Sequence, residues 1–364
     1  MHSLALKSAM AIAGALLIAG APSSPVVAEV VFTGVQGTAS PYLAGMPPGS
    51  TCCLDGTPPT PPNDTAPEES PAQVLGIPLV PGTVLTFSVS GGVSNESGGA
   101  PTNGPDGDAF FTSPFTGLPG TDEGNGIARM NAPVNALVGV FLDDRAPNTS
   151  PAPPGLDFSD GGLGRAFGQL CPGLKQPFFI GDGLTGQGGG ARQQFVVPAG
   201  ATRFFLGTVD GFDWNSNNGS YGVVVTSTTP MSIATGVNQP VFGVGQTMLA
   251  SVALNSQAQA GAADFYLGLL HPDGSTIEFL TSGGGVAIGN LANPSSFRTV
   301  AAGIPLGAPI SVSVPNVFAH QWTGAEPRGT YVFFLLGVRS GTFADGNLGC
   351  NDTLGLGTTA FSFP

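Results

Sequence analysis

The residues best suited to chemistry lie between positions 209 and 225, in the stretch VDGFDWNSNNGSYGVVV. Nine consecutive residues hold two carboxylates and three carboxamides, namely Asp210, Asp213, Asn215, Asn217 and Asn218. A strand-like run ends at Asp210 and an alternating, Val-rich run begins at Gly219, which predicts a loop between two strands. Ca²⁺ takes six to eight oxygen ligands of these kinds, so the loop is a candidate calcium site. The alternative is that Asn, Asp and Gly are present only because they form turns well.

Catalytic motifs are absent from the sequence. Catalysis by a nucleophile and a base needs a base such as histidine close to Ser or Cys. After residue 28 the only histidines are His271 and His320, and no nucleophile motif lies near either. The carboxylate pairs at 122–123 and 143–144 are typical of solvated loop ends. We therefore expect a protein that is not an enzyme.

Charge and composition restrict the partners. The formal net charge is −13, with only 10 Lys plus Arg, so no basic surface is predicted for binding nucleic acid. Residues 1–28 have the pattern of a cleaved signal peptide, with Lys7, the apolar run AMAIAGALLIAGA and a small-residue site ending at Ala28. We expect an exported protein, extracellular or at the cell surface or in the periplasm, whose mature chain has no integral membrane segment.

The pattern of apolar residues predicts an all-β fold with two β-sandwich domains, at 29–228 and 231–364. Short alternating runs separated by Gly and Pro supply the strands, and the second domain is predicted to be Ig- or fibronectin-like. A Pro-rich stretch at 41–73 is predicted to be an irregular arm over the surface, because proline cannot donate to a sheet. Asp273-Gly274 lies between two apolar runs and predicts a hairpin. The predicted strands are 84–94, 135–143, 194–199, 202–210, 220–227, 247–255, 264–280, 309–314 and 330–338.

The four cysteines allow three pairings, which the sequence does not distinguish. Export makes disulfides plausible. Because adjacent cysteines pair with strain, we expect Cys52, Cys53 or both to reach Cys171 or Cys350. A zinc site is not expected, since the chain has no Cys-x-x-Cys motif.

The first domain resembles the PA-I galactophilic lectin family of calcium-dependent, sugar-binding β-sandwiches. The resemblance runs from 70–95 through GPDGD (104–108), NALVGVF (135–141) and PFFIGDG (177–183) to 204–225. The family pattern is an aspartate at a strand end, two asparagines seven and eight positions later, and then Gly-Ser-aromatic. The chain also resembles exported, Gly-rich proteins of environmental bacteria.

The resemblance implies a ligand set for Ca²⁺. Asp210, Asn217 and Asn218 match the side-chain ligands of the family, and the backbone carbonyls would belong to Trp214 and to a residue at or next to Asn95. The register after Asn218 is one residue shorter, so Ser216 is an alternative to Asn218.

The resemblance does not extend to the sugar. The galactose-binding His-Pro-Gln cluster of the family is missing from 109–126, so galactose specificity is not implied. Phe212 and Trp214, with Asp213 nearby, are candidates to contact a sugar, and loop packing is the alternative for both aromatic rings. The sequence thus favours a secreted, non-catalytic, calcium-dependent protein that binds an extracellular glycan or polysaccharide. The alternative is a structural surface or matrix protein in which calcium only rigidifies a loop.

Overall fold

The protein is all-β in the computed structural model, which describes residues 28–53, 64–109, 111–112, 124–211, 213–345, 349 and 352–364. The predicted signal peptide, Phe212 and Cys350 lie outside the described residues, apart from Ala28. Over the described ranges there is no α-helix, only five short 3₁₀ helices. No described helix is long and apolar enough to cross a membrane. The chain divides into two compact units, Ala28–Thr228 and Thr229–Pro364.

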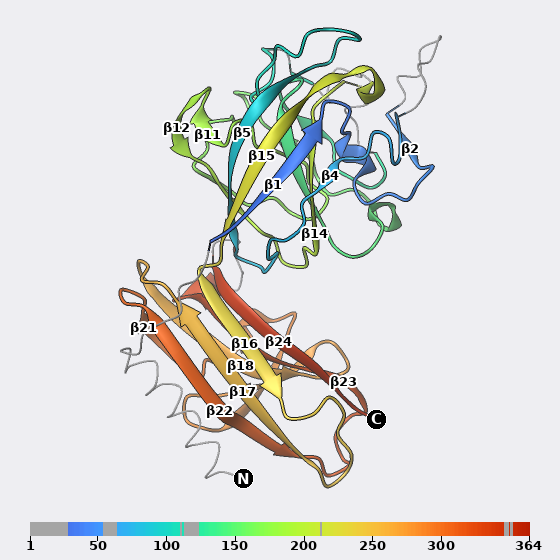
Figure 1. The fold of residues 1–364 in the computed structure, drawn as a ribbon. Coiled ribbons are helices and arrows are strands. Elements are labelled where there is room, and N and C mark those ends of the chain that lie inside the picture. The colour runs from blue at the N-terminus through green and yellow to red at the C-terminus, as the bar shows by residue number, and fades with distance from the viewer. Residues whose placement is uncertain are drawn as a thin grey trace. The chain divides into compact units, whose positions relative to one another are not determined.

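The unit Ala28–Thr228 contains two main sheets, and neighbouring strands of one of them, β1, β15 and β5, run side by side in Figure 1. The five-stranded sheet has the order β1 (Glu29–Gln36), β15 (Asn218–Thr228), β5 (Val84–Ser94), β13 (Gln194–Val196) and β9 (Gln169–Leu170). The four-stranded sheet has the order β10 (Phe178–Phe179), β7 (Leu137–Leu142), β14 (Arg203–Thr208) and β4 (Ala72–Gln73). The described residues of this unit also form three short pairs: β2 (Thr51–Cys52) with β3 (Asp64–Thr65), β6 (Met130–Asn131) with β8 (Leu156–Asp157), and β11 (Leu184–Gly186) with β12 (Gly189–Arg192).

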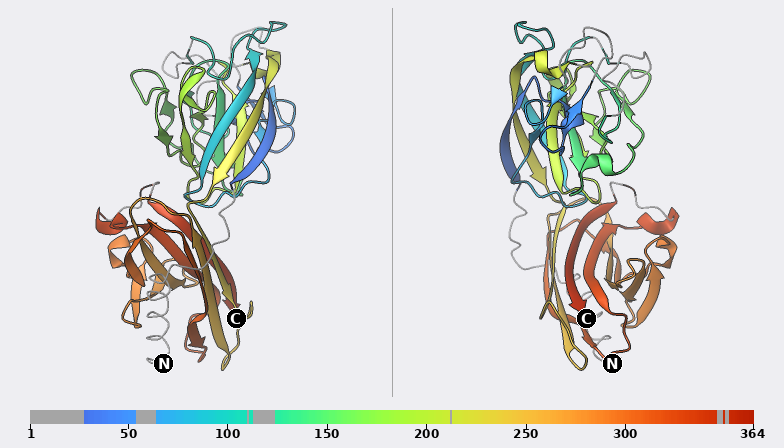
Figure 2. Two further views of the ribbon diagram at one scale, coloured as in Figure 1. Left: turned by 60° about the vertical axis from the view of Figure 1, so that its left-hand side comes forward. Right: turned by 90° about the vertical axis from the view of Figure 1, so that its right-hand side faces the viewer.

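Alternation along the strands builds the core of this unit. In β15, Tyr221, Val223 and Val225 are buried while the residues between them are more exposed, as a half-buried strand requires. Phe87 of β5 meets Phe204 of β14 at a centroid distance of 6.0 Å, so the two sheets share one core. This arrangement is consistent with a β-sandwich, and Figure 2 shows the strands of this unit in layers.

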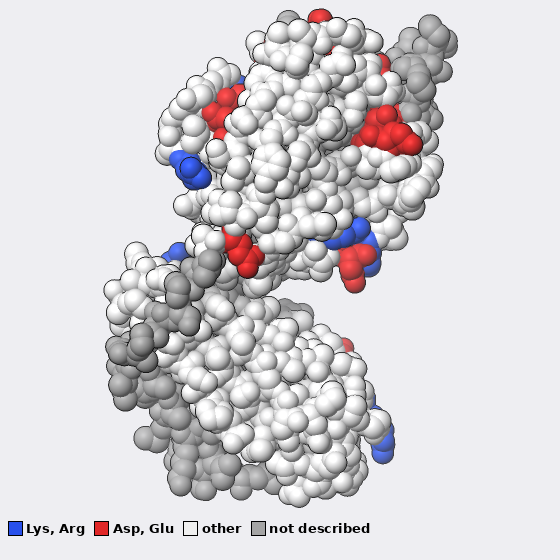
Figure 3. Space-filling model, in the orientation of Figure 1, with Lys and Arg blue, Asp and Glu red and all other residues white. Residues whose placement is uncertain are grey.

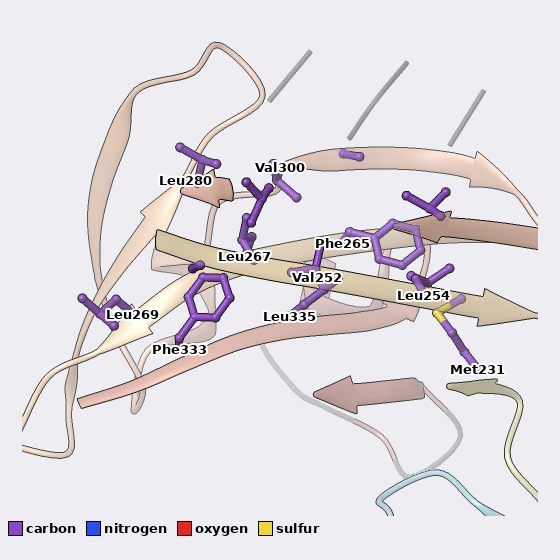
Figure 4. Close-up of a cluster of buried hydrophobic side chains, with 14 of the residues drawn as sticks. Met231, Val252, Leu254, Phe265, Leu267, Leu269, Leu280, Val300, Phe333 and Leu335 are labelled. Atoms are coloured by element: carbon purple, nitrogen blue, oxygen red, sulfur yellow. The ribbon is translucent and has the colours of Figure 1, made fainter. Parts of the chain in front are cut away.

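The unit Thr229–Pro364 also consists of two sheets. One has the order β16 (Met231–Val237), β17 (Thr247–Ser256) and β22 (Ile310–Gln321). The other has the order β20 (Val286–Asn290), β19 (Thr276–Leu280), β18 (Ala262–Leu270), β23 (Gly329–Arg339) and β24 (Thr353–Phe363), with β21 (Ala301–Pro305) also paired to β18. Side chains of both sheets meet in one apolar core, including Val252 and Leu254 from one sheet and Phe265 and Phe333 from the other (Figure 4).

Most of the predicted strands are confirmed, and so is the hairpin at Asp273-Gly274. Strands β18 and β19 pair as antiparallel neighbours, and the Asp273 carboxylate accepts the backbone N–H groups of Ser275 and Thr276, each at 2.8 Å. The described part also contains strands that were not predicted, among them β1, β16 and β24. Charged residues make up only 9% of the chain, and most of the surface shown in Figure 3 is accordingly neither acidic nor basic.

Two expectations for the Pro-rich stretch need correction. Its first part forms the 3₁₀ helix η1 (Pro41–Leu43), whose three residues are buried, so it contributes to the interior as well as to the surface. Cys52 and Cys53 form a disulfide with each other, so the expectation that they reach Cys171 or Cys350 is wrong. Their sulfur atoms lie 3.4 Å and 3.6 Å from the Ser40 hydroxyl, beside the apolar cluster that contains Tyr42 and Trp214.

Candidate functional site

The loop between β14 and β15 holds most of the predicted ligands. Strand β14 ends at Thr208, Asp210 follows two residues later, and β15 begins at Asn218. The 3₁₀ helix η3 (Trp214–Ser216) occupies the middle of the loop. Asp210 and Asn217 are only 7% and 6% exposed, although polar loop residues are usually solvated. The strand ends therefore bring a carboxylate and a carboxamide into a buried position.

The backbone carbonyl of Gly37, directly after β1, fixes the orientation of Asn217. It accepts hydrogen bonds from Thr208 Oγ1 at 2.7 Å and from Asn217 Nδ2 at 3.1 Å. Because a Cβ at residue 37 would lie 2.6 Å from the Asn218 carbonyl oxygen, only glycine permits this close approach. With its amide nitrogen held, Asn217 presents Oδ1 in a fixed direction. That oxygen is buried and has no hydrogen-bond partner among the described residues.

The pairing of β15 with β5 brings the fifth predicted residue to the same place. Asn218 lies opposite Ser94, the last residue of β5, so Asn95 follows beside it. Asn218 is half-buried and donates its Nδ2 to the Glu96 carbonyl at 3.1 Å, whereas Asn95 is exposed. The structure thus places Asp210, Asn217, Asn218 and Asn95, as well as the backbone of Trp214, around the same end of this unit.

Asn135 joins this group, although the sequence did not single it out. It precedes β7, it is 0% exposed, and its Nδ2 donates to Asn95 Oδ1 at 3.0 Å. Its backbone N–H donates to the Val209 carbonyl at 2.7 Å, next to Asp210. Its own Oδ1 is buried without a partner in the described part of the chain. The only sequence signal is a polar residue directly before an apolar strand, which is too common to identify a site.

Trp214 does not offer its ring to a sugar. The side chain is 1% exposed and packs edge-on against Tyr42, with ring centroids 5.8 Å apart. Its Nε1 donates to the Thr208 carbonyl at 2.9 Å, so the ring closes the base of its own loop. The loop-packing alternative therefore holds for this ring. Its backbone carbonyl accepts the Asn217 N–H at 3.0 Å and keeps a second lone pair.

The other two candidates for sugar contact are Phe212 and Asp213. Phe212 lies outside the described residues. Asp213 is half-buried, and its Oδ1 is shielded from solvent without a hydrogen-bond partner in the described ranges. Gly211 N–H donates to Asp210 Oδ1, which orients that carboxylate at the start of the loop. Carboxylate and carboxamide oxygens are therefore both present in the loop.

Asp64 anchors the loop from β3, a contribution that sequence reasoning also missed. It is 1% exposed and accepts the backbone N–H groups of Asn215 at 2.8 Å and Trp214 at 3.3 Å. These are the free donors at the start of η3, which a carboxylate satisfies well. Burial raises the pKa of Asp64 to about 7, the two N–H donors oppose that rise, and the negative charges of Glu69 and Asp213 add to it.

The chemistry of this donor set suits a hard cation. Every candidate ligand atom is an oxygen, and no described His or free thiol lies in the loop. Buried polar atoms are normally satisfied, yet Asn217 and Asn135 each present a shielded oxygen without a partner in the described part. The residues present therefore fit a calcium ion, which would supply the missing positive charge to these oxygens.

Comparisons with known proteins identify no lectin family. No protein-family model matches the chain, and no curated protein matches it. An alkylpurine DNA glycosylase from Pseudomonas fluorescens is 14% identical, with a TM-score of 0.19, over 36% of this chain and 30% of that chain. The CARDB domain of a Pyrococcus furiosus protein is 13% identical, with a TM-score of 0.20, over 37% of this chain and 87% of that chain. A DUF4785 family protein from Legionella pneumophila is 11% identical, with a TM-score of 0.21, over 80% of this chain and 56% of that chain. The similarity to these three proteins is distant, and the mostly-β, multi-sheet character of the chain is shown by its own described strands.

Proposed function

We propose that Ala28–Thr228 is a calcium-dependent carbohydrate-binding module of an exported, non-catalytic protein. The observation that carries the proposal is the Asn217 carboxamide. Its Nδ2 is held by the Gly37 carbonyl, and its buried Oδ1 has no partner in the described part of the chain. A buried acceptor without a partner costs about 1–3 kcal/mol, which a bound cation would recover. The spacing of Asp210, Asn217 and Asn218 and the pairing that brings up Asn95 supply further oxygens to the same place.

The proposed ligand set consists of side-chain oxygens from Asp210, Asn217 and Asn218 and backbone carbonyls of Trp214 and of a residue at or next to Asn95. Ca²⁺ accepts such a mixed, partly neutral set, whereas Mg²⁺ demands a tighter octahedron and retains its waters. Few charged ligands imply weak affinity, with a Kd of ~10⁻⁴ to 10⁻³ M, as in extracellular modules. Such affinity suits an exported protein, because calcium is abundant only outside the cell.

The carbohydrate part of the proposal rests on the resemblance to calcium-dependent lectins, in which two vicinal sugar hydroxyls complete the coordination of the ion. The chain's own residues would orient the ion and leave positions facing solvent, near the exposed Asn95. A second candidate function is a structural module in which calcium only rigidifies the loop. The burial of the Trp214 ring favours this second function, because it removes one of the two predicted stacking surfaces.

A glycan array separates the two functions. The mature protein is applied in 10 mM calcium (about ten times the expected Kd or more) and again in EDTA. The variants Asp210→Ala and Asp144→Ala are compared, since Asp144 is an exposed carboxylate of the same unit and serves as the control. Binding that needs calcium and is lost only in Asp210→Ala supports the lectin function. If calcium binds but no glycan does, the structural function is correct.

The other proposals concern the rest of the chain. We propose that the unit Thr229–Pro364 is an Ig- or fibronectin-like spacer, because its two sheets enclose one apolar core. We also propose that residues 1–28 direct export. N-terminal sequencing of the secreted protein tests the second proposal, which requires a mature chain that begins near Glu29.

A further inference from the structure

Asn135 has a buried carboxamide in which only one of the two polar atoms has a hydrogen-bond partner among the described residues. Its Nδ2 donates to Asn95 Oδ1 at 3.0 Å, but its Oδ1 has no partner among the described residues, and the side chain is 0% exposed. The two polar atoms of a carboxamide lie on the same carbon. The free oxygen is therefore also close to Asn95, one of the residues of the predicted calcium site.

The backbone of Asn135 is fixed on three sides. Its N–H donates to the Val209 carbonyl at 2.7 Å, its carbonyl accepts the Tyr221 hydroxyl at 2.8 Å, and its φ is +70°. The left-handed conformation is one that asparagine tolerates better than most residues. Residue 136, next in the chain, accepts the Val209 N–H at 3.0 Å, so the start of β7 is tied to the residue before Asp210. Asn135 therefore spans from the Asp210 side of the loop to the Asn95 side.

We propose that Asn135 Oδ1 is a ligand of the calcium ion, in addition to the residues that the loop motif supplies. This inference rests on the proposed calcium site. A fixed, desolvated carboxamide oxygen is a good ligand for Ca²⁺ because no reorganisation is needed when the ion binds. It also adds an oxygen without adding charge, in a proposed ligand set whose one carboxylate is that of Asp210.

Two substitutions distinguish a ligand from a residue that only positions Asn95. Asn135→Gly keeps the positive φ and removes both polar atoms, whereas Asn135→Asp keeps the oxygens but can no longer donate to Asn95. If Asn135 is a ligand, the glycine variant binds calcium about tenfold more weakly or worse. The aspartate variant then binds at least as tightly as the unmodified protein, because a charged oxygen replaces a neutral one. A purely positioning role predicts that both variants are weakened alike.

The measurement is isothermal titration of the full mature chain with calcium chloride, together with the calcium-induced rise in its unfolding temperature. Asn316→Gly is the matched control, since Asn316 also has a positive φ of 55° but lies exposed in the other unit. Loss of affinity in Asn135→Gly with retention in Asn135→Asp is the expected result. Unchanged affinity in the glycine variant, or equal weakening in both, overturns the inference while calcium binding itself stands. Absence of calcium binding by the unmodified protein overturns the proposed site as well.

Discussion

The buried carboxylate of Asp64 predicts an unusual pH dependence of stability. Its pKa is raised in the folded protein, from the usual 3.8 to about 7, chiefly by burial. A group with a raised pKa contributes its full stability below its unfolded pKa and loses it as pH rises through the folded value. The difference between the unfolded and folded pKa values of Asp64 corresponds to a loss of about 4 kcal/mol in the unfolding free energy over this pH range. Without calcium, the unit Ala28–Thr228 should therefore become less stable between about pH 4 and pH 7.

The variant Asp64→Asn isolates this effect. Its carboxamide oxygen can accept only one of the two N–H groups, from Asn215 and Trp214, that the carboxylate accepts. Near pH 8 this lost hydrogen bond costs the variant about 1–3 kcal/mol, which is less than the cost of burying the charge of Asp64. Near pH 4 the folded protein holds Asp64 as the neutral acid, whose hydroxyl oxygen is also a poor acceptor. The two proteins should therefore have similar stability near pH 4, and the variant should be more stable near pH 8.

Urea unfolding in EDTA at a series of pH values provides the measurement. The chain has two tryptophans, so a Trp322→Phe background leaves only Trp214, whose backbone N–H contacts Asp64, to report by fluorescence. Subtracting the curve measured with Asp64→Asn from the curve measured with Asp64 intact removes the contribution of other carboxyl groups. Parallel curves, or a variant that is less stable at every pH, would refute the account of Asp64 as a desolvated anchor of the loop.

Three further substitutions test the framework of the site. Trp214→Ala should lower the unfolding free energy by about 3–5 kcal/mol, because the buried ring is replaced by a cavity; a loss under 1 kcal/mol in urea titration would contradict this packing. Tyr221→Phe should lower the unfolding free energy by about 1–3 kcal/mol, because the Tyr221 hydroxyl lies within hydrogen-bond distance of the backbone carbonyls of Asn103, Gly104 and Asn135. An unchanged midpoint of urea unfolding would show that this hydroxyl is not needed for stability. Gly219→Ala should lower the unfolding free energy by more than the ~1–2 kcal/mol expected for placing a side chain at a positive φ, because the new Cβ would also lie 2.3 Å from the Gly92 carbonyl oxygen. An unfolding temperature equal to that of the unmodified protein would refute the pairing register of β15 with β5.

The strands could be predicted where apolar and polar residues alternate strongly, and several were missed where this alternation is weaker. The predicted strand 84–94 coincides with β5, and 247–255 falls within β17. Strand β24 was missed because Gly355 and Gly357 weaken its pattern. Both glycines face β16, where a Cβ would lie 2.5 Å from the Met231 carbonyl and 2.8 Å from the Ile233 side chain. The local pattern is weak there because the packing of β24 against β16 requires small residues.

The candidate site could be predicted only in its local part. The spacing of Asp210, Asn217 and Asn218 is visible in the sequence because these residues share one loop. Asp64 and Asn135 come from distant segments, and their positions depend on strand pairing and on backbone hydrogen bonds to the loop. The Cys52–Cys53 disulfide was not expected because strain between neighbouring cysteines argued against it. The sequence could not predict the burial of the Trp214 ring, since an aromatic side chain in a loop can point toward solvent or toward the protein interior.

The most direct test of the central claim is a calorimetric titration of the mature chain with calcium chloride. The proposed site predicts one saturable binding event with a Kd of ~10⁻⁴ to 10⁻³ M, which is lost in Asp210→Ala and retained in the exposed-carboxylate control Asp144→Ala. Absence of a saturable heat in the unmodified protein, or equal binding by Asp210→Ala, would contradict the assignment of this loop as a calcium site.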